Sequence, residues 1–107
     1  MTPDDLRAQL HQVGLELRKA AGAIESLEVE AERAELDAQA CMDGVYLTAE
    51  GSVEDRKALA RQECLGQRDG AVVARAGLNR ARMKAKHLEL EQMRLMALLK
   101  SVQAEGA

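Results

Sequence analysis

The chain has almost no aromatic residues and almost no proline. It contains one Tyr, no Phe, no Trp and one Pro among its 107 residues. Without aromatic rings, Ala, Leu, Val, Ile and Met must fill the core, which suits long helices packed side by side. Only "VYLT" at 45–48 has strand character, and it is too short to build a sheet. The composition therefore predicts an all-α protein with a single domain over residues 1–107.

Residue patterns typical of catalytic or metal-binding sites are also lacking. Cys41 and Cys64 are the only cysteines and have neither metal-ligand nor CxxC spacing, so we expect small buried packing residues rather than a disulfide or a reactive thiol. His11 and His87 have no ligand partners at metal spacing and are expected on helix surfaces. There is no Ser-His-Asp set, phosphate-cradling Gly loop or HExxH motif. We therefore predict that the protein is not an enzyme and uses no metal or cofactor.

A secretory or membrane segment is not expected. The first residues, "MTPDDLRAQL", have no basic stretch followed by an apolar one. No apolar run approaches the length of a membrane span. We therefore predict a cytoplasmic location, which includes the cytoplasm of an infected bacterial host.

Two long helices are expected. Thr2-Pro3-Asp4-Asp5 predicts a helix start, and apolar or small residues then recur at steps of four and three from Leu6 to Val45. Gly44 is expected to end this helix, over about 3–43. After a connection at 44–52, Ser52 caps a second helix over about 53–103 with the same stepping. The short connection predicts a long antiparallel, coiled-coil-like hairpin.

The second helix has one weak segment, "LGQRDGAVV" at 65–73. Each of its two glycines costs roughly 1 kcal/mol against Ala in a helix. The seam keeps its phase through this segment, which favours a continuous helix, whereas the glycine pair favours a kink or break at 66–70. The sequence leaves both alternatives open.

The register of the hairpin can be predicted from side-chain size. Pairing residues whose numbers sum to about 98 places large residues opposite small ones. Leu17 then meets Ala81, and Ala34 faces Cys64 near the turn. The resulting charge pairs are Glu35 with Arg61, Glu28 with Arg68, and Arg7 with Glu89.

Basic residues gather in the second half of the chain. Residues 1–50 carry four bases and eleven acids, and residues 51–107 carry eleven bases and seven acids. The predicted register leaves Arg75 and Arg82 opposite Ala21 and Gly14, without acidic partners. We define the basic band as Arg75, Arg80, Arg82, Lys84 and Lys86 with Arg18 and Lys19. It has three interpretations: a solvated helix face, a site for a polyanion such as single-stranded DNA, or a site for a protein partner.

A second apolar surface lies outside the seam. We define the apolar row as Leu65, Val72, Met83, Leu90, Met93, Met96 and Leu98. On the first helix, Leu15, Val29 and Leu36 recur on the far side. An apolar surface of this kind needs a cover, and too few residues remain for a third long helix. We therefore predict that the chain forms a homo-oligomer, as a bundle or a ring.

The segments "AERAELDAQA", "GSVEDRKALA" and "ARAGLNRARMKAKHLELEQM" resemble the small phage proteins related to the recombination mediator UvsY. The resemblance covers about residues 20–103. It implies a ring-like oligomer that binds single-stranded DNA and helps to load a recombinase or annealing protein. Arg75, Arg80, Arg82, Lys84 and Lys86 would then contact phosphates. The alternative is a small helical interaction protein, such as a phage-encoded inhibitor or adaptor, that docks on a host protein without binding nucleic acid.

Overall fold

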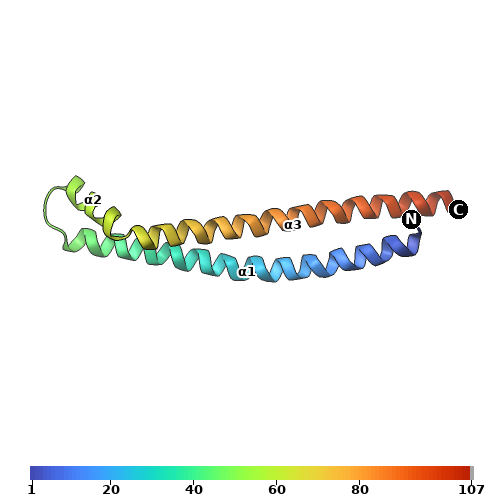
Figure 1. Ribbon diagram of the computed structural model, residues 1–107, viewed down its shortest axis with the longest axis horizontal. Helices are drawn as coiled ribbons and strands as arrows, with labels where there is room; N and C mark the ends of the chain where they lie inside the picture. The colour runs from blue at the N-terminus through green and yellow to red at the C-terminus, as the bar shows by residue number, and fades with distance from the viewer. Residues whose placement is uncertain (107) are drawn as a thin grey trace. The chain divides into compact units, whose positions relative to one another are not determined.

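The protein is an all-α helical hairpin, as the sequence predicts. The computed structural model describes residues 1–106 and contains α1 (Pro3–Thr48), α2 (Val53–Glu63) and α3 (Leu65–Gly106), shown in Figure 1. Within residues 1–106 there is no strand. The four residues between α1 and α2 form the turn.

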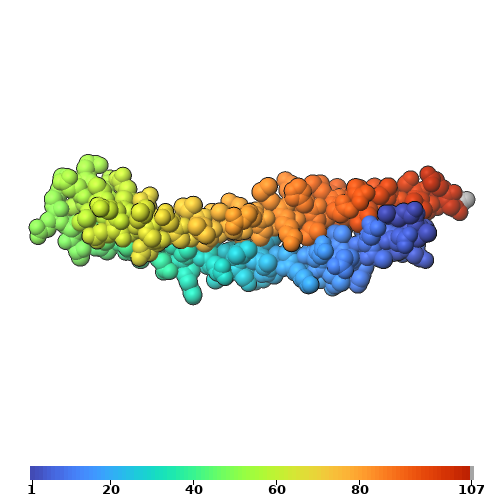
Figure 2. All heavy atoms as spheres, in the orientation of Figure 1, coloured from blue at the N-terminus to red at the C-terminus, as the bar shows by residue number. Residues whose placement is uncertain are grey.

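The contacts divide the chain into two compact units. The terminal unit consists of Met1–Glu25 with Arg80–Ala107, and the turn unit is Ser26–Asn79. Within each unit, a segment of α1 lies beside an antiparallel segment of α3 (Figure 1). The space-filling view shows side chains of the paired segments in contact, for example the blue start of α1 against the red end of α3 (Figure 2).

Both predicted helix starts are confirmed by their caps. The backbone N–H of Asp5 donates to Oγ1 of Thr2 at 3.2 Å, and the N–H of Thr2 donates back to Asp5 Oδ2 at 3.1 Å. This reciprocal pair satisfies donors that the first turn of a helix leaves without partners. At α2, the N–H of Asp55 donates to Oγ of Ser52 at 3.1 Å.

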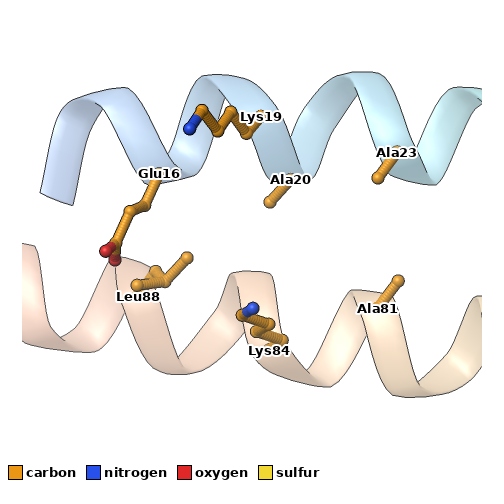
Figure 3. Close-up of a pocket in the computed structure, with 7 residues that line it drawn as sticks. All are labelled: Glu16, Lys19, Ala20, Ala23, Ala81, Lys84 and Leu88. Atoms are coloured by element: carbon orange, nitrogen blue, oxygen red, sulfur yellow. The ribbon is translucent and has the colours of Figure 1, made fainter.

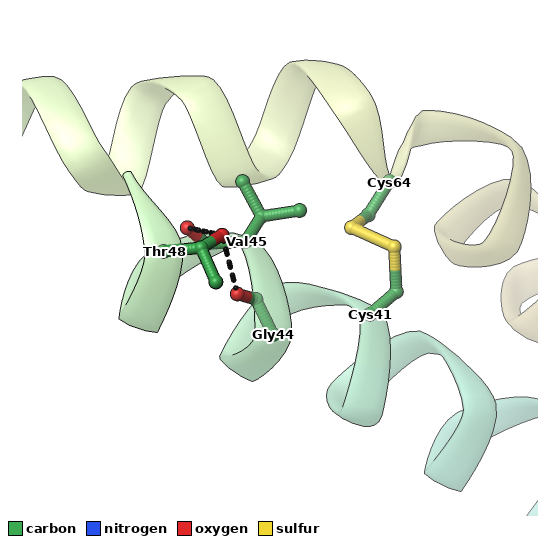
Figure 4. The surroundings of a disulfide bond; sticks show 5 residues. All are labelled: Cys41, Gly44, Val45, Thr48 and Cys64. Carbon is green, nitrogen blue, oxygen red and sulfur yellow. Dashed lines mark hydrogen bonds between the residues drawn. A yellow bond between two sulfur atoms is a disulfide. The ribbon is translucent and has the colours of Figure 1, made fainter. Parts of the chain in front are cut away.

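The first helix runs further than predicted. It continues through Gly44 to Thr48, whose hydroxyl donates to the carbonyl of Gly44 at 3.0 Å (Figure 4). Glycine ends a helix where the chain turns into the left-handed region, and Gly44 does not do so. The glycine with a positive φ, at 109°, is Gly51, so the reversal of the chain falls there.

The second helical segment is interrupted, but not at its glycines. α2 ends at Glu63 and α3 begins at Leu65, so the break falls at Cys64, whose φ and ψ are −97° and 17°. The break is mild, because the N–H of Cys64 still donates to Ala60 O at 3.0 Å and that of Arg68 to Cys64 O at 3.0 Å. Gly66 and Gly70 lie inside α3, which is continuous through both.

The expectation that the cysteines are unpaired packing residues is wrong. Cys41 on α1 and Cys64 form a disulfide across the turn unit, with their Cα atoms 5.9 Å apart (Figure 4). Cys64 is fully buried as predicted, but its sulfur atom is bonded to that of Cys41. The spacing in the sequence gave no sign of the pair because the hairpin brings the two positions together.

The predicted register is also wrong, by one heptad. The disulfide joins residues whose numbers sum to 105 rather than about 98, and Cys41 takes the place predicted for Ala34. In the terminal unit, Leu99 and Val102 pack against a cluster that contains Leu6, whereas the predicted register would leave both beyond the chain's start.

The error has a physical reason. A heptad seam repeats every seven residues, so registers one heptad apart use the same positions. Size matching favoured large against small residues. The structure instead groups large residues in the terminal unit, where Leu6, Val13 and Leu95 are buried together. The buried residues of the turn unit are mostly small, namely Ala31, Ala38, Ala60 and Cys64 with Leu78.

Candidate interaction surfaces

Six of the seven members of the basic band lie in the terminal unit, and five of these six have no ion-pair partner among residues 1–106. We call these five the terminal basic cluster: Arg18 and Lys19 from α1, and Arg80, Lys84 and Lys86 from α3. All five side chains are exposed. None of them forms an ion pair with any residue of the described range 1–106. The helices bring the two parts of the cluster together because the register of this unit places residues near 19 opposite residues near 85.

A cavity of about 300 Å³ in the terminal unit is lined by two members of this cluster. Lys19 on α1 and Lys84 on α3 line it from opposite sides (Figure 3). Ala20, Ala23 and Ala81 form its narrow walls, and their small side chains leave the space open. Figure 3 shows the ammonium group of Lys84 on the side of α3 that faces α1. An anionic group in this cavity would have the side chains of Lys19 and Lys84 among its neighbours.

One acid belongs to this cavity. Glu16 lines it and extends toward Leu88 (Figure 3). Among residues 1–106 Glu16 has no ion-pair partner, so it does not neutralise Lys84 by direct contact. The cavity holds two cations and one anion, and its net charge is positive.

Two members of the basic band are not free, contrary to the prediction. In the turn unit, Nε and Nη2 of Arg75 both donate to Oε1 of Glu35, with Nε at 2.9 Å. Arg82 also has an interaction partner. The prediction failed because it placed Ala21 opposite Arg75. The shift of one heptad moves the acidic part of α1, with Glu28 and Glu35, to the height of Arg75, and Glu35 pairs with it.

The other predicted charge pairs are not formed either, because they depended on the predicted register. Glu35 pairs with Arg75 and not with Arg61. Arg7 pairs with Asp4 on its own helix at 3.0 Å and not with Glu89. Within residues 1–106, Arg61, Arg68 and Glu89 form no ion pair.

The whole apolar row is exposed. The exposed fractions of its side chains range from 38% for Leu98 to 68% for Val72. Leu65 and Val72 belong to the turn unit and the other five to the terminal unit. Met83, Leu90 and Met93 follow a second heptad pattern on α3, on a different face from the buried Leu95.

The first helix has exposed apolar residues of its own. Leu15, Val29 and Leu36 are 37%, 58% and 70% exposed and recur at heptad spacing. An exposed apolar surface on both helices is typical of proteins that associate with another chain.

One polar contact near the turn was not predicted from the sequence. Arg56 donates from Nε and Nη2 to the carbonyl of Tyr46 at 3.0 and 2.7 Å, and its guanidinium lies 4.2 Å from the centre of the Tyr46 ring. The signal available in the sequence was that the chain's single aromatic residue and an arginine flank the same short turn. This contact occupies one face of the only ring that could stack on a base.

Within residues 1–106 no three His, Cys, Asp or Glu side chains are placed to hold a metal ion. None of the helices there has both the length and the apolar character needed to cross a bilayer.

Comparison with known proteins adds no relative. No family model, no curated protein and no solved structure matches the chain. The class of protein is therefore defined by the fold alone, an all-α helical hairpin with a basic cluster and an exposed apolar row.

Proposed function

We propose that the protein is a self-associating helical hairpin that binds single-stranded DNA through the terminal basic cluster and acts as a recombination accessory protein of the phage mediator type. The observation that carries the proposal is that Arg18, Lys19, Arg80, Lys84 and Lys86 lie in one unit, exposed and without an ion-pair partner among residues 1–106. A chain of net charge −3 must collect its cations locally to attract a polyanion.

Binding of this kind would depend on phosphates and not on base sequence. The chain has a single aromatic ring, and Arg56 covers one face of it. Stacking can therefore contribute little, and Lys and Arg contacts to phosphate oxygens would supply the affinity. In an oligomer the cluster would repeat in each copy, and weak contacts would add up through avidity.

The test is a salt series of binding to a fluorescent single-stranded oligonucleotide. We expect log Kd to rise steeply with log salt, and the triple change Lys19→Gln, Lys84→Gln and Lys86→Gln to flatten the slope by about 2, at roughly 0.7 per lost phosphate contact. The matched control changes Arg33, Lys57 and Lys100 to Gln, because all three are exposed cations outside the cluster. Absence of wild-type binding at low salt would reject the proposal, and so would equal effects of the two sets.

A second candidate function is favoured by the apolar row. Met83, Leu90 and Met93 are more than half exposed, and flexible Met side chains suit a surface that adapts to a partner. The protein would then be a helical adaptor or inhibitor that docks on another protein and binds no nucleic acid. The salt series separates the two, because an adaptor shows no DNA binding at any salt concentration.

A further inference from the structure

The two units depend on different forces. The terminal unit buries Leu6, Val13 and Leu95, and five further Leu and Val side chains pack against them. The buried residues of the turn unit are three alanines, Cys64 and Leu78. Because stabilisation by burial grows with the apolar area removed from water, the turn unit gains much less from its core than the terminal unit does.

Arg56 and Tyr46 hold the ends of α1 and α2 together at the turn itself. The ion pair between α1 and α3 does not fix the pairing of the rest of the turn unit. The Glu35–Arg75 ion pair is about half exposed on both sides, so it is weak. Arginines recur at heptad spacing as Arg61, Arg68 and Arg75. If α1 moved by one heptad, Glu35 would meet Arg68 in place of Arg75. The ion pair therefore fits both registers.

The disulfide supplies what these contacts lack. It joins α1 at Cys41 to the point where α2 ends and α3 begins, at Cys64. The two cysteines are 23 residues apart in the sequence. Closing a loop of this size restricts the open chain enough to change the opening equilibrium by roughly 10²-fold. There is no other cysteine in the chain, so the pair cannot exchange with a third thiol of the same molecule.

We propose that the Cys41–Cys64 disulfide is a redox-controlled clamp that keeps the turn unit closed. A thiolate of an external dithiol, or of glutathione-type thiols, attacks one sulfur and forms a mixed disulfide, and a second thiolate displaces the protein sulfur. The protein gains two electrons and two protons as two thiols, and the reductant leaves as its own disulfide. Reduction then opens the turn unit and leaves the Leu-rich terminal unit closed.

In the predicted cytoplasmic location, the disulfide would be exposed to reducing thiols. Thiols of the glutathione type keep most cysteine pairs reduced in that compartment. The chain would then close its turn unit only when conditions become oxidising. The hairpin would lose the pairing of α1 with α2 and α3 in the turn unit without losing its main hydrophobic core.

Hydrogen exchange measured by mass spectrometry on the full chain tests the proposal. Amide exchange is compared in oxidised glutathione and in dithiothreitol, with peptides assigned to each unit. We expect dithiothreitol to speed exchange in peptides from 26–79 by about 10²-fold and to change peptides from 1–25 and 80–106 by less than about 2-fold. The variant Cys41→Ala/Cys64→Ala should show the fast rates in both buffers.

Three results would overturn the clamp. The first is that alkylation detects two free thiols after incubation in oxidised glutathione, which would mean that the disulfide does not form. The second is unchanged exchange on reduction. The third is an equal increase in both units, which would mean that the disulfide supports the whole hairpin. All three are independent of DNA binding, so the clamp and the proposed function can fail separately.

Discussion

Arg75 on α3 and Glu35 on α1 face each other across the turn unit, and two N–H groups of the arginine donate to one carboxylate oxygen. Both side chains are roughly half exposed, at 42% and 47%. Solvent and salt therefore screen the pair, and it tunes the stability of the hairpin without dominating it.

The Glu35–Arg75 pair gives the first prediction. Glu35→Gln should lower the free energy of unfolding by about 0.3–1 kcal/mol at low salt, and the loss should shrink at 1 M salt. Urea denaturation at both salt concentrations measures it. Glu32→Gln is the control, because Glu32 is exposed and forms no ion pair within residues 1–106. A loss from Glu32→Gln as large as that from Glu35→Gln would contradict the prediction.

The glycines of α3 give the second prediction. A Cβ added at Gly66 or Gly70 would meet no atom within 4 Å, and both positions are helical. Gly66→Ala and Gly70→Ala should each raise the free energy of unfolding by about 0.5–1 kcal/mol, because alanine loses less backbone entropy in a helix. Thermal denaturation followed by circular dichroism measures this change.

The control for the glycines is Gly51. Its φ is 109°, and a Cβ there would lie 3.3 Å from Oδ2 of Asp55. Gly51→Ala should therefore destabilise the hairpin. Stabilisation at Gly51, or destabilisation at both Gly66 and Gly70, would show that the positions of turn and helix differ from those described.

The apolar row gives the third prediction, on self-association. Sedimentation velocity at micromolar concentration should detect species larger than a monomer. Leu90→Glu with Met93→Glu should shift the protein toward monomer, because a contact between chains would have to bury two new charges. Gln62→Glu with Gln103→Glu adds the same charge at exposed positions outside the row and should leave the size unchanged. A monomeric wild type at high concentration would remove the basis of this proposal.

The fourth prediction concerns acid. The pKa of Asp5 is lowered below 3.8 because its carboxylate accepts a hydrogen bond from the Thr2 backbone N–H and because it interacts with the Thr2 side chain. The pKa of Glu91 is lowered by its hydrogen bonds from Arg94. Both groups favour the folded state when ionised, so their contribution is complete above their unfolded pKa values and is lost as the pH falls through the folded ones.

A pH titration of stability measures this effect. The free energy of unfolding of the wild type should fall below about pH 4, and Asp5→Asn should remove part of that fall. Asp69→Asn is the control, because Asp69 is exposed and forms no ion pair within residues 1–106. A steeper fall in Asp5→Asn than in the wild type would contradict the assignment.

Local features were predictable from sequence because they depend on residues a few positions apart. The caps at Thr2 and Ser52 follow from side chains that reach the next helical turn. The exposure of the apolar row follows from heptad phase, since a residue outside the seam cannot reach the partner helix. The antiparallel hairpin follows from two apolar seams joined by a short connection.

Only the tertiary structure decided the register and everything that depends on it. The seam repeats every seven residues, so the sequence satisfies two registers with the same positions, and side-chain size selected the wrong one. The structure pairs Cys41 with Cys64. The predicted register placed Ala34 opposite Cys64, one heptad away, and so did not indicate the disulfide. The partner of Arg75 changed for the same reason, from Ala21 to Glu35. Contacts between residues far apart in sequence depend on which repeat meets which, and a periodic sequence leaves that choice to packing and to the bond between Cys41 and Cys64.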